Sequence, residues 1–145
     1  MSSGPVPKPA AAGPVVLVSN RQRTPVDIPA LVDLASRTLV AEGRPDVELS
    51  LSFVTPAEIE ELHVRFMDEP GPTDVLSFPL DEDGLLGDVV VCPDVAAANA
   101  PDLDGELRQL VVHGILHLLG FDHQEEGERA VMWERQERHS GVSAP

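Results

Sequence analysis

The sequence is poor in cysteine, in basic residues and in long apolar runs, and each shortage excludes a class of protein. Its 145 residues include one cysteine, Cys92, so no internal disulfide framework can hold the chain together. No stretch reaches the roughly 18 apolar residues that a membrane-spanning helix needs. Residues 1–14 lack the apolar segment of a secretory signal and are rich in proline, glycine, serine and alanine. We therefore expect a disordered tail over these residues and a protein without membrane contact. The single cysteine leaves the compartment open, and we favour a reducing cytosol.

Basic side chains are scarce as well. The chain carries 25 acidic against 10 basic residues, which gives a formal net charge of −15 at pH 7. Such a surface repels polyanions at long range. Either the acidic residues serve only solvation, or a nucleic-acid substrate is held by a local patch against this background.

What the sequence does contain is a regular succession of strand and helix patterns. Apolar runs and alternation predict strands over residues 15–19, 47–54, 74–78 and 87–92, and helical spacing predicts helices over 28–42, 56–67, 93–100, 106–119 and 124–140. The order predicts an α+β fold, with a small, mostly parallel mixed sheet of about four strands packed with about five helices. One domain is expected over residues 15–140, followed by a C-terminal tail over residues 141–145.

Three of the predicted helices carry expectations about burial. The helix over 56–67 begins at a capping box formed by Thr55 and Glu58. Its buried side chains are expected to be Ile59, Leu62 and Phe66. The helix over 106–119 is apolar on nearly every side, which is typical of a centrally buried helix. The apolar face of the last helix is expected to consist of Ala130, Val131 and Trp133.

The segment HGILHLLGFDH has the spacing of a metal site. His113 and His117 lie four residues apart on a predicted helix, so both imidazoles project from the same face. Gly120 then allows the chain to reverse, and His123 follows as a third ligand. The spacing reproduces the HExxHxxGxxH motif of metzincin proteases, except that Gly114 stands where those enzymes carry glutamate.

We interpret this segment as a zincin-like metal helix that binds one zinc ion per chain. Without a metal, three histidines in one small buried region would each need a separate polar partner. Three nitrogen ligands leave one coordination position open, which is typical of catalytic zinc. Cys92 is either a fourth ligand or, as we favour, a core cysteine. Asp122 either orients a ligating imidazole or shapes the turn, and we favour the turn.

The histidine segment, together with PTDVLSFP at 72–79 and GDVVVC at 87–92, closely resembles the YbeY family of bacterial rRNA maturation factors, in a form like its actinobacterial members. The resemblance implies a zinc-dependent, single-strand-specific endoribonuclease that acts in the cytoplasm in 16S rRNA 3′-end maturation and ribosome quality control. It also implies RNA and the small ribosomal subunit with its associated proteins as partners. By the same resemblance, the zinc ligands are His113, His117 and His123.

One position departs from the family pattern. The family commonly has an arginine, taken to contact RNA phosphate, six residues before the threonine of the PTD motif, and this chain has Met67 there. The Met67 position is therefore a substrate-binding candidate, and Arg65 is a candidate catalytic residue nearby. Because residues two apart lie about 200° apart around a helix, Arg65 is not equivalent to the family arginine, and we expect it on a solvated helix face.

The glycine at position 114 bears on the class of reaction. In a metzincin, the glutamate passes a proton from the zinc-bound water to a poor amine leaving group. Phosphodiester cleavage needs less help, because zinc alone lowers the pKa of its water towards about 7 and neutralises phosphoryl charge. Glycine is also expected to leave open space beside the metal. We therefore rank a metallo-endoribonuclease first, a zinc-stabilised assembly factor without enzymatic activity second, and a zinc peptidase third.

Overall fold

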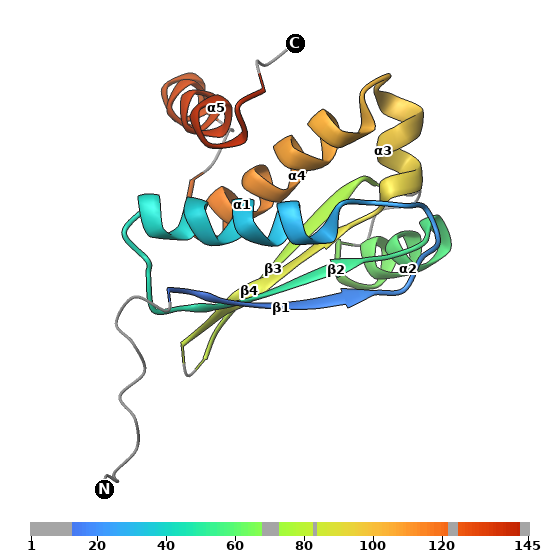
Figure 1. The fold of residues 1–145 in the computed structure, drawn as a ribbon, viewed down its shortest axis with the longest axis horizontal. Helices are drawn as coiled ribbons and strands as arrows, with labels where there is room; N and C mark the ends of the chain where they lie inside the picture. The colour runs from blue at the N-terminus through green and yellow to red at the C-terminus, as the bar shows by residue number, and fades with distance from the viewer. Residues whose placement is uncertain (1–12, 68–72, 83, 122–124, 143–145) are drawn as a thin grey trace, which may run out of the picture.

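A mixed four-stranded sheet lies at the centre of the computed structural model, which describes residues 13–67, 73–82, 84–121 and 125–142. The elements are β1 (Val15–Asn20), α1 (Ile28–Ala41), β2 (Glu48–Phe53), α2 (Pro56–Met67), β3 (Val75–Glu82), β4 (Leu85–Val91), α3 (Pro93–Asn99), α4 (Leu103–Leu118) and α5 (Glu126–Ser140). The strand order is β1-β2-β4-β3; the first three strands of this order are parallel, and β3 pairs antiparallel with β4 (Figure 1). The predicted mostly parallel α+β fold with five helices is confirmed for these residues.

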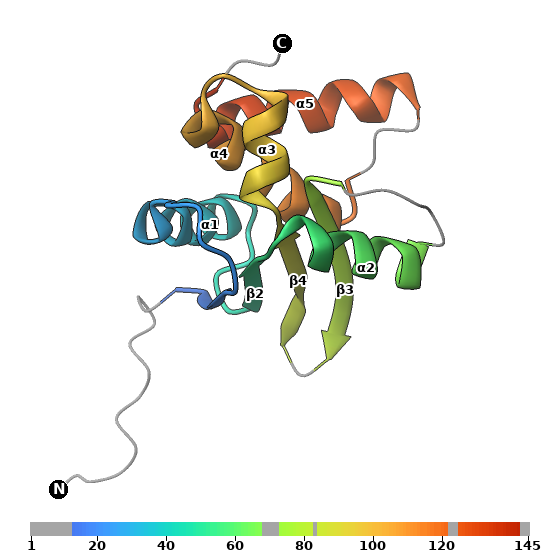
Figure 2. The same cartoon turned by 90° about the vertical axis from the view of Figure 1, so that its right-hand side faces the viewer.

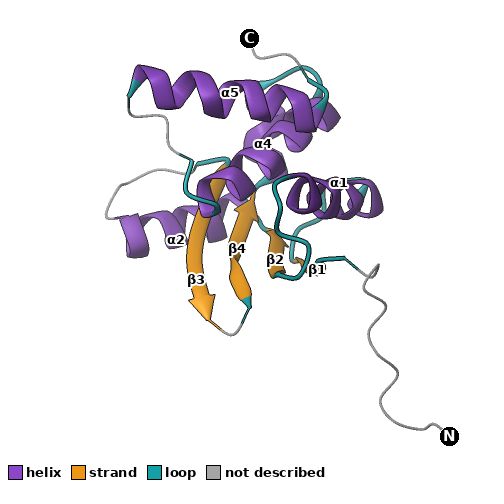
Figure 3. Cartoon of the chain, turned by 90° about the vertical axis from the view of Figure 1, so that its left-hand side faces the viewer, coloured by secondary structure: helices purple, strands orange, loops and turns teal. Residues whose placement is uncertain are grey.

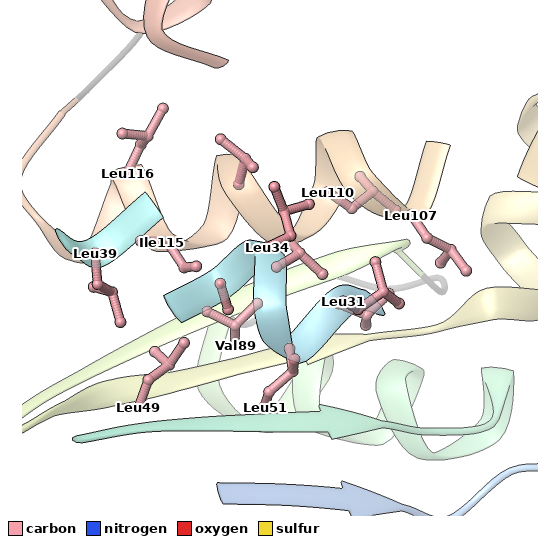
Figure 4. Close-up of a cluster of buried hydrophobic side chains, with 14 of the residues drawn as sticks. Leu31, Leu34, Leu39, Leu49, Leu51, Val89, Leu107, Leu110, Ile115 and Leu116 are labelled. Carbon is pink, nitrogen blue, oxygen red and sulfur yellow. The ribbon is translucent and has the colours of Figure 1, made fainter. Parts of the chain in front are cut away.

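The larger core lies between the sheet and the two helices α1 and α4, which cover the same face (Figure 1). In β2, Leu49 and Leu51 point into this core, whereas Ser50 points to the opposite face, as strand alternation requires. Figure 4 shows side chains from α1, α4, β2 and β4 filling the layer. The helix that carries His113 and His117, α4, is buried along the side that faces this core, which agrees with its expected central position.

The opposite face of the sheet is covered in part by α2 (Figure 2). Cys92 is fully buried in this second core as a free thiol, which agrees with a core cysteine, and burial raises its pKa. The expected burial of Phe66 is wrong, because this side chain is 58% exposed. Exposure increases along α2 from the buried Ile59 to Phe66, whose ring meets Phe78 edge-on with centres 5.3 Å apart. Phe66 at the end of α2 is therefore largely open to solvent, although its ring still contacts the sheet.

Helix α5 is the outermost element and packs on α4 and α1 (Figure 3). The predicted apolar face of this helix is wrong. The buried apolar residue of α5 is Met132, whereas the three residues of the predicted face are exposed: Ala130, Val131 and Trp133. The other inward positions, three and seven residues after Met132, are the polar Arg135 and His139. Because two of these three inward residues are polar, the spacing of apolar residues could not predict this buried face.

These inward polar residues bind a carboxylate at the end of α1. Arg135 donates from Nη1 to Glu42 Oε1 at 2.8 Å, and His139 Nε2 lies 2.6 Å from Glu42 Oε2. Only 6% of the Glu42 side chain and 9% of the His139 side chain are exposed. Burial raises the pKa of Glu42, but the hydrogen bonds from His139 and Arg135 outweigh it, and the net pKa lies below the ordinary value. The cluster fixes α5 to α1.

Two element boundaries differ from the sequence prediction. The hairpin strands extend to Glu82 and from Leu85, past the predicted strand ends at residues 78 and 87, and their ladder has an irregularity between Pro79 and Glu82. Helix α4 begins at Leu103, because the Asp102 carboxylate caps it by accepting from the Gly105 amide at 3.2 Å.

The predicted tails fall mainly outside the described residues, which begin at residue 13 and end at residue 142. The predicted disorder of the N-terminal tail and the C-terminal tail over residues 141–145 stay predictions. Within the described ranges, no helix is long and apolar enough to cross a membrane.

Candidate metal centre

Helix α4 brings the first two histidines of the motif together. Gly120 follows the helix with φ 102°, a left-handed conformation that favours glycine, and the Phe121 amide donates to the Leu116 carbonyl at 3.0 Å. This closes the helix after Leu118, and the predicted cap at Gly120 is confirmed.

The two imidazoles lie near the separation that one zinc ion requires. The ring centres of His113 and His117 lie 6.0 Å apart, and the rings are tilted by 52°. With bonds of 2.0–2.1 Å and tetrahedral angles, two imidazoles on the same zinc have ring centres roughly 5 Å apart. A small rotation of the side chains would therefore bring the pair onto a shared metal. His113 is half-buried and His117 is exposed, so one side of the pair is open to solvent.

The remaining predicted parts of the centre lie outside the described residues. This applies to His123, the predicted third ligand, and to Asp122, predicted to orient a ligand or shape the turn. Considering only the described part of the chain, no group of three or more His, Cys, Asp and Glu side chains is placed to hold a metal. The complete three-histidine site stays a prediction.

A residue that sequence reasoning missed, Gln136 of α5, contacts the first histidine. Its Oε1 lies 2.9 Å from His113 Nδ1. In this orientation of the Gln136 amide the oxygen accepts, so Nδ1 carries the proton and donates. The other ring nitrogen, Nε2, then has the lone pair that a metal requires. The signal for Gln136 was its position one turn after Met132, but the wrong apolar face predicted for α5 concealed it.

The indole of Trp133 lies against the same histidine. Its centre is 5.9 Å from that of His113, with the planes tilted by 47°. Trp133 and Gln136 lie three residues apart on α5 and hence on the same side of the helix. Helix α5 therefore contacts His113 through both an aromatic ring and a hydrogen bond, and its position determines that of the imidazole.

Gly114 faces the sheet, and the expectation of open space there is wrong. A Cβ at this position would lie 2.6 Å from Val89 Cγ1 and 3.2 Å from Ser77 Oγ. In addition, the Ser77 hydroxyl donates to the Gly114 carbonyl at 3.1 Å. The missing side chain thus allows α4 to approach β3 and β4 closely, directly beside His113.

The residues considered for phosphate contact lie at the end of α2. Arg65 donates to Glu61 Oε1 at 3.2 Å within the same helix, and 62% of its side chain is exposed. Such a pair contributes only about 0.3–0.5 kcal/mol. Met67 is the last residue of α2, and its side chain lies outside the described part of the structure.

Comparison with known proteins identifies the family. The family model for endoribonuclease YbeY matches residues 17–141. The chain belongs to this family. Among its relatives, endoribonuclease YbeY of Streptomyces coelicolor is 47% identical over 136 residues, covering 80% of this chain and 82% of the relative. The protein of the same name from Beutenbergia cavernae is 45% identical over 137 residues, covering 83% of this chain and 91% of the relative.

The similarity to the YbeY family has a counterpart in three dimensions. A solution structure of a Thermotoga maritima protein, 31% identical in sequence, matches with a TM-score of 0.63 and covers 87% of each chain. The family resemblance drawn from three short sequence segments, including its actinobacterial character, is confirmed by these matches.

Proposed function

We propose that this chain is a zinc-dependent endoribonuclease that cleaves single-stranded RNA, acting in 16S rRNA 3′-end maturation and ribosome quality control. The observation that carries the proposal is the oriented histidine pair of α4 in a member of the endoribonuclease YbeY family. The ring centres of His113 and His117 lie 6.0 Å apart, and the Gln136 contact at Nδ1 favours the His113 tautomer whose Nε2 can ligate a metal. RNA is the substrate that the names of the relatives support.

The residues present suit zinc chemistry. His113, His117 and, by family resemblance, His123 would hold one zinc ion per chain through imidazole nitrogens. When bound, zinc supplies a Lewis acid that activates water and neutralises charge on a phosphoryl oxygen. Gln136 keeps His113 in the ligating tautomer, and such partners typically contribute 10- to 100-fold in metal affinity.

The absence of a carboxylate at position 114 supports phosphodiester over peptide cleavage. In the described structure, the direction of a side chain from Gly114 is occupied by Val89 and Ser77. A protein base at this position would therefore require the helix or its neighbours to shift. A reaction with a poor amine leaving group would need such a base more than phosphodiester cleavage does.

The partners and location in this proposal come from the family resemblance. We propose that the chain acts on the small ribosomal subunit and its associated proteins in the cytoplasm. A second candidate is a zinc-stabilised assembly factor without enzymatic activity. The net charge of −15 and the methionine at position 67 favour it, because both weaken the hold on RNA phosphate. A zinc peptidase ranks third.

One experiment separates these functions. Single-stranded RNA is incubated with metal-quantified protein, with and without chelator, beside His117→Ala and the control His63→Ala, which removes a histidine of α2 outside the motif. We expect one zinc per chain, cleavage that stops in chelator, and loss of most zinc and cleavage only in His117→Ala. Cleavage that persists after zinc is lost would contradict zinc dependence. Full zinc content without cleavage would favour the assembly factor.

A further inference from the structure

We infer that Trp133 is a stacking platform for an unpaired RNA base beside the first histidine of the candidate metal centre. The inference deepens the proposed function and rests on it. The preference for single-stranded RNA would then come from the Trp133 side chain, and its ligand would be a nucleobase whose face is not stacked on another base.

The exposure of Trp133 is not explained by core packing. The chain has only five aromatic side chains of the Phe, Trp and Tyr type, four phenylalanines and this tryptophan. Phe53 is fully buried, whereas the indole of Trp133, the largest of them, is 36% exposed. The inward apolar position of α5 is filled by the neighbouring Met132. About a third of the Trp133 surface is therefore open to solvent, beside the buried Met132.

The indole of Trp133 lies next to the histidine pair that we propose to bind zinc. Its ring centre lies 5.9 Å from that of His113, and Gln136 of the same helix holds His113 by a hydrogen bond. Helix α5 is itself fixed to α1 through the buried Glu42. The indole thus has a defined place relative to the histidine pair. A base stacked on it would bring the adjoining RNA backbone close to His113 and His117.

Charge makes a stacking contact particularly useful in this chain. A net charge of −15 repels the RNA backbone, so electrostatic attraction contributes less than in most RNA-binding proteins. Stacking of a base on an aromatic ring does not depend on net charge and tolerates any base. It also requires a base whose face is free. A duplex offers its base faces to neighbouring pairs, so an indole at this position would select unpaired RNA without reading its sequence.

The sequence offers a direct probe, because Trp133 is the only tryptophan and there is no tyrosine. Intrinsic fluorescence excited in the indole band therefore reports on this site alone. The zinc-loaded chain is mixed rapidly with an oligouridine of about 12 nucleotides, and the emission is read before the RNA is cut. Binding is followed in parallel by the polarisation of labelled RNA, and the same strand in a duplex is the comparison. We expect the single strand to quench Trp133 emission in a saturable way, with the same midpoint concentration as the polarisation curve. The duplex should change the emission little.

Variants then separate stacking from a role in shielding His113. Trp133→Leu keeps an apolar cover but removes the aromatic face, and Trp133→Phe keeps a smaller face. Leu17→Ala is the control, since Leu17 is 51% exposed on the edge strand β1. We expect Trp133→Leu to weaken single-strand binding roughly 5- to 150-fold, Trp133→Phe to restore most of it, and the control to bind normally, all at unchanged zinc content.

The outcomes distinguish this inference from the proposed function. Single-strand binding without a change in Trp133 emission, or equal binding by Trp133→Leu and the original chain, would overturn the stacking role and leave the nuclease intact. Loss of zinc in both Trp133 variants, with unchanged RNA affinity, would show that the indole only protects the metal centre. If the original chain neither binds nor cuts single-stranded RNA, both proposals are overturned.

Discussion

Gly114→Ala tests the close contact between α4 and the sheet. A methyl group at this position would lie 2.6 Å from Val89 Cγ1 and 3.1 Å from its Cγ2. Val89 is fully buried, and its β-branched side chain has little freedom to rotate away. Overpacking of this kind costs about 1–3 kcal/mol. Replacing glycine by alanine within a helix returns up to about 1 kcal/mol. We therefore expect a net loss of about 1 kcal/mol in the free energy of unfolding.

Gly127→Ala is the matched control for this change. Gly127 lies in α5, and a Cβ added there meets no atom within 4 Å. It gains the helix propensity without the clash, so the two alanine variants should differ by about 2 kcal/mol in urea unfolding. Truncating the obstacle in a Gly114→Ala, Val89→Ala double variant should recover part of the loss and give a favourable coupling energy of about 0.5–3 kcal/mol.

The same variants also report on the histidines. A methyl group that pushes α4 away from β4 displaces His113 and His117 together, so Gly114→Ala should bind zinc more weakly, whereas Gly127→Ala should not. If both variants are equally stable and bind zinc equally well, α4 does not approach the sheet as closely as described. Additive effects of Gly114→Ala and Val89→Ala would likewise refute the contact.

Three further changes have defined outcomes. Gln136→Leu should lower zinc affinity 10- to 100-fold by competition with a chelator, while Gln136→Glu, which still accepts from His113, should retain it; equal affinities would refute the orienting role. Glu42→Gln should cost about 2 kcal/mol of unfolding free energy at pH 7. Because the pKa of folded Glu42 is lowered, this contribution is present above its ordinary pKa of about 4.3 and is lost as the pH falls through the lowered value, so the two unfolding curves should converge in acid. Met67→Arg should raise RNA cleavage roughly tenfold or more at equal zinc content and low salt, whereas Met67→Leu should change little; no increase would place the phosphate contact elsewhere.

Local patterns were enough to predict most of the fold. The alternation of Leu49 and Leu51 with serines defined β2, and the glycine at position 43 marks the end of α1 with φ 78°. Each of these signals depends on residues close together in sequence. The prediction failed for α5, because its inward side carries Arg135 and His139, which meet Glu42 from 93 and 97 residues further along the chain. Polar residues that satisfy one another in a core cannot be told from surface residues by periodicity.

The same distinction applies to the candidate site. The neighbouring placement of His113 and His117 follows from helix geometry alone, so four-residue spacing was sufficient to predict it. The contact between His113 and Gln136 joins two helices and depends on how α5 docks. The purpose of Gly114 was likewise hidden, because it depends on β4 lying beneath α4. Contacts made through tertiary packing have no local sequence signal.

Gly114→Glu tests whether the close packing of α4 on the sheet prevents a glutamate base at position 114. The substitution restores the metzincin motif, but the new side chain would start within 2.6 Å of Val89 and 3.2 Å of Ser77. An ionised carboxylate placed there without a charged partner would cost several kcal/mol, so α4 must move or the glutamate must be protonated. We therefore expect loss of stability and of zinc, with no cleavage of an unfolded protein substrate by the variant at matched metal content. Robust proteolysis would show that the space between helix and sheet adapts to a base, and would raise the peptidase from the third rank to the first. If the space does not adapt, the close contact between α4 and the sheet leaves no room for the glutamate that a protease uses as its base. The site is then restricted to reactions that a metal-activated water can perform without a protein base, such as phosphodiester cleavage.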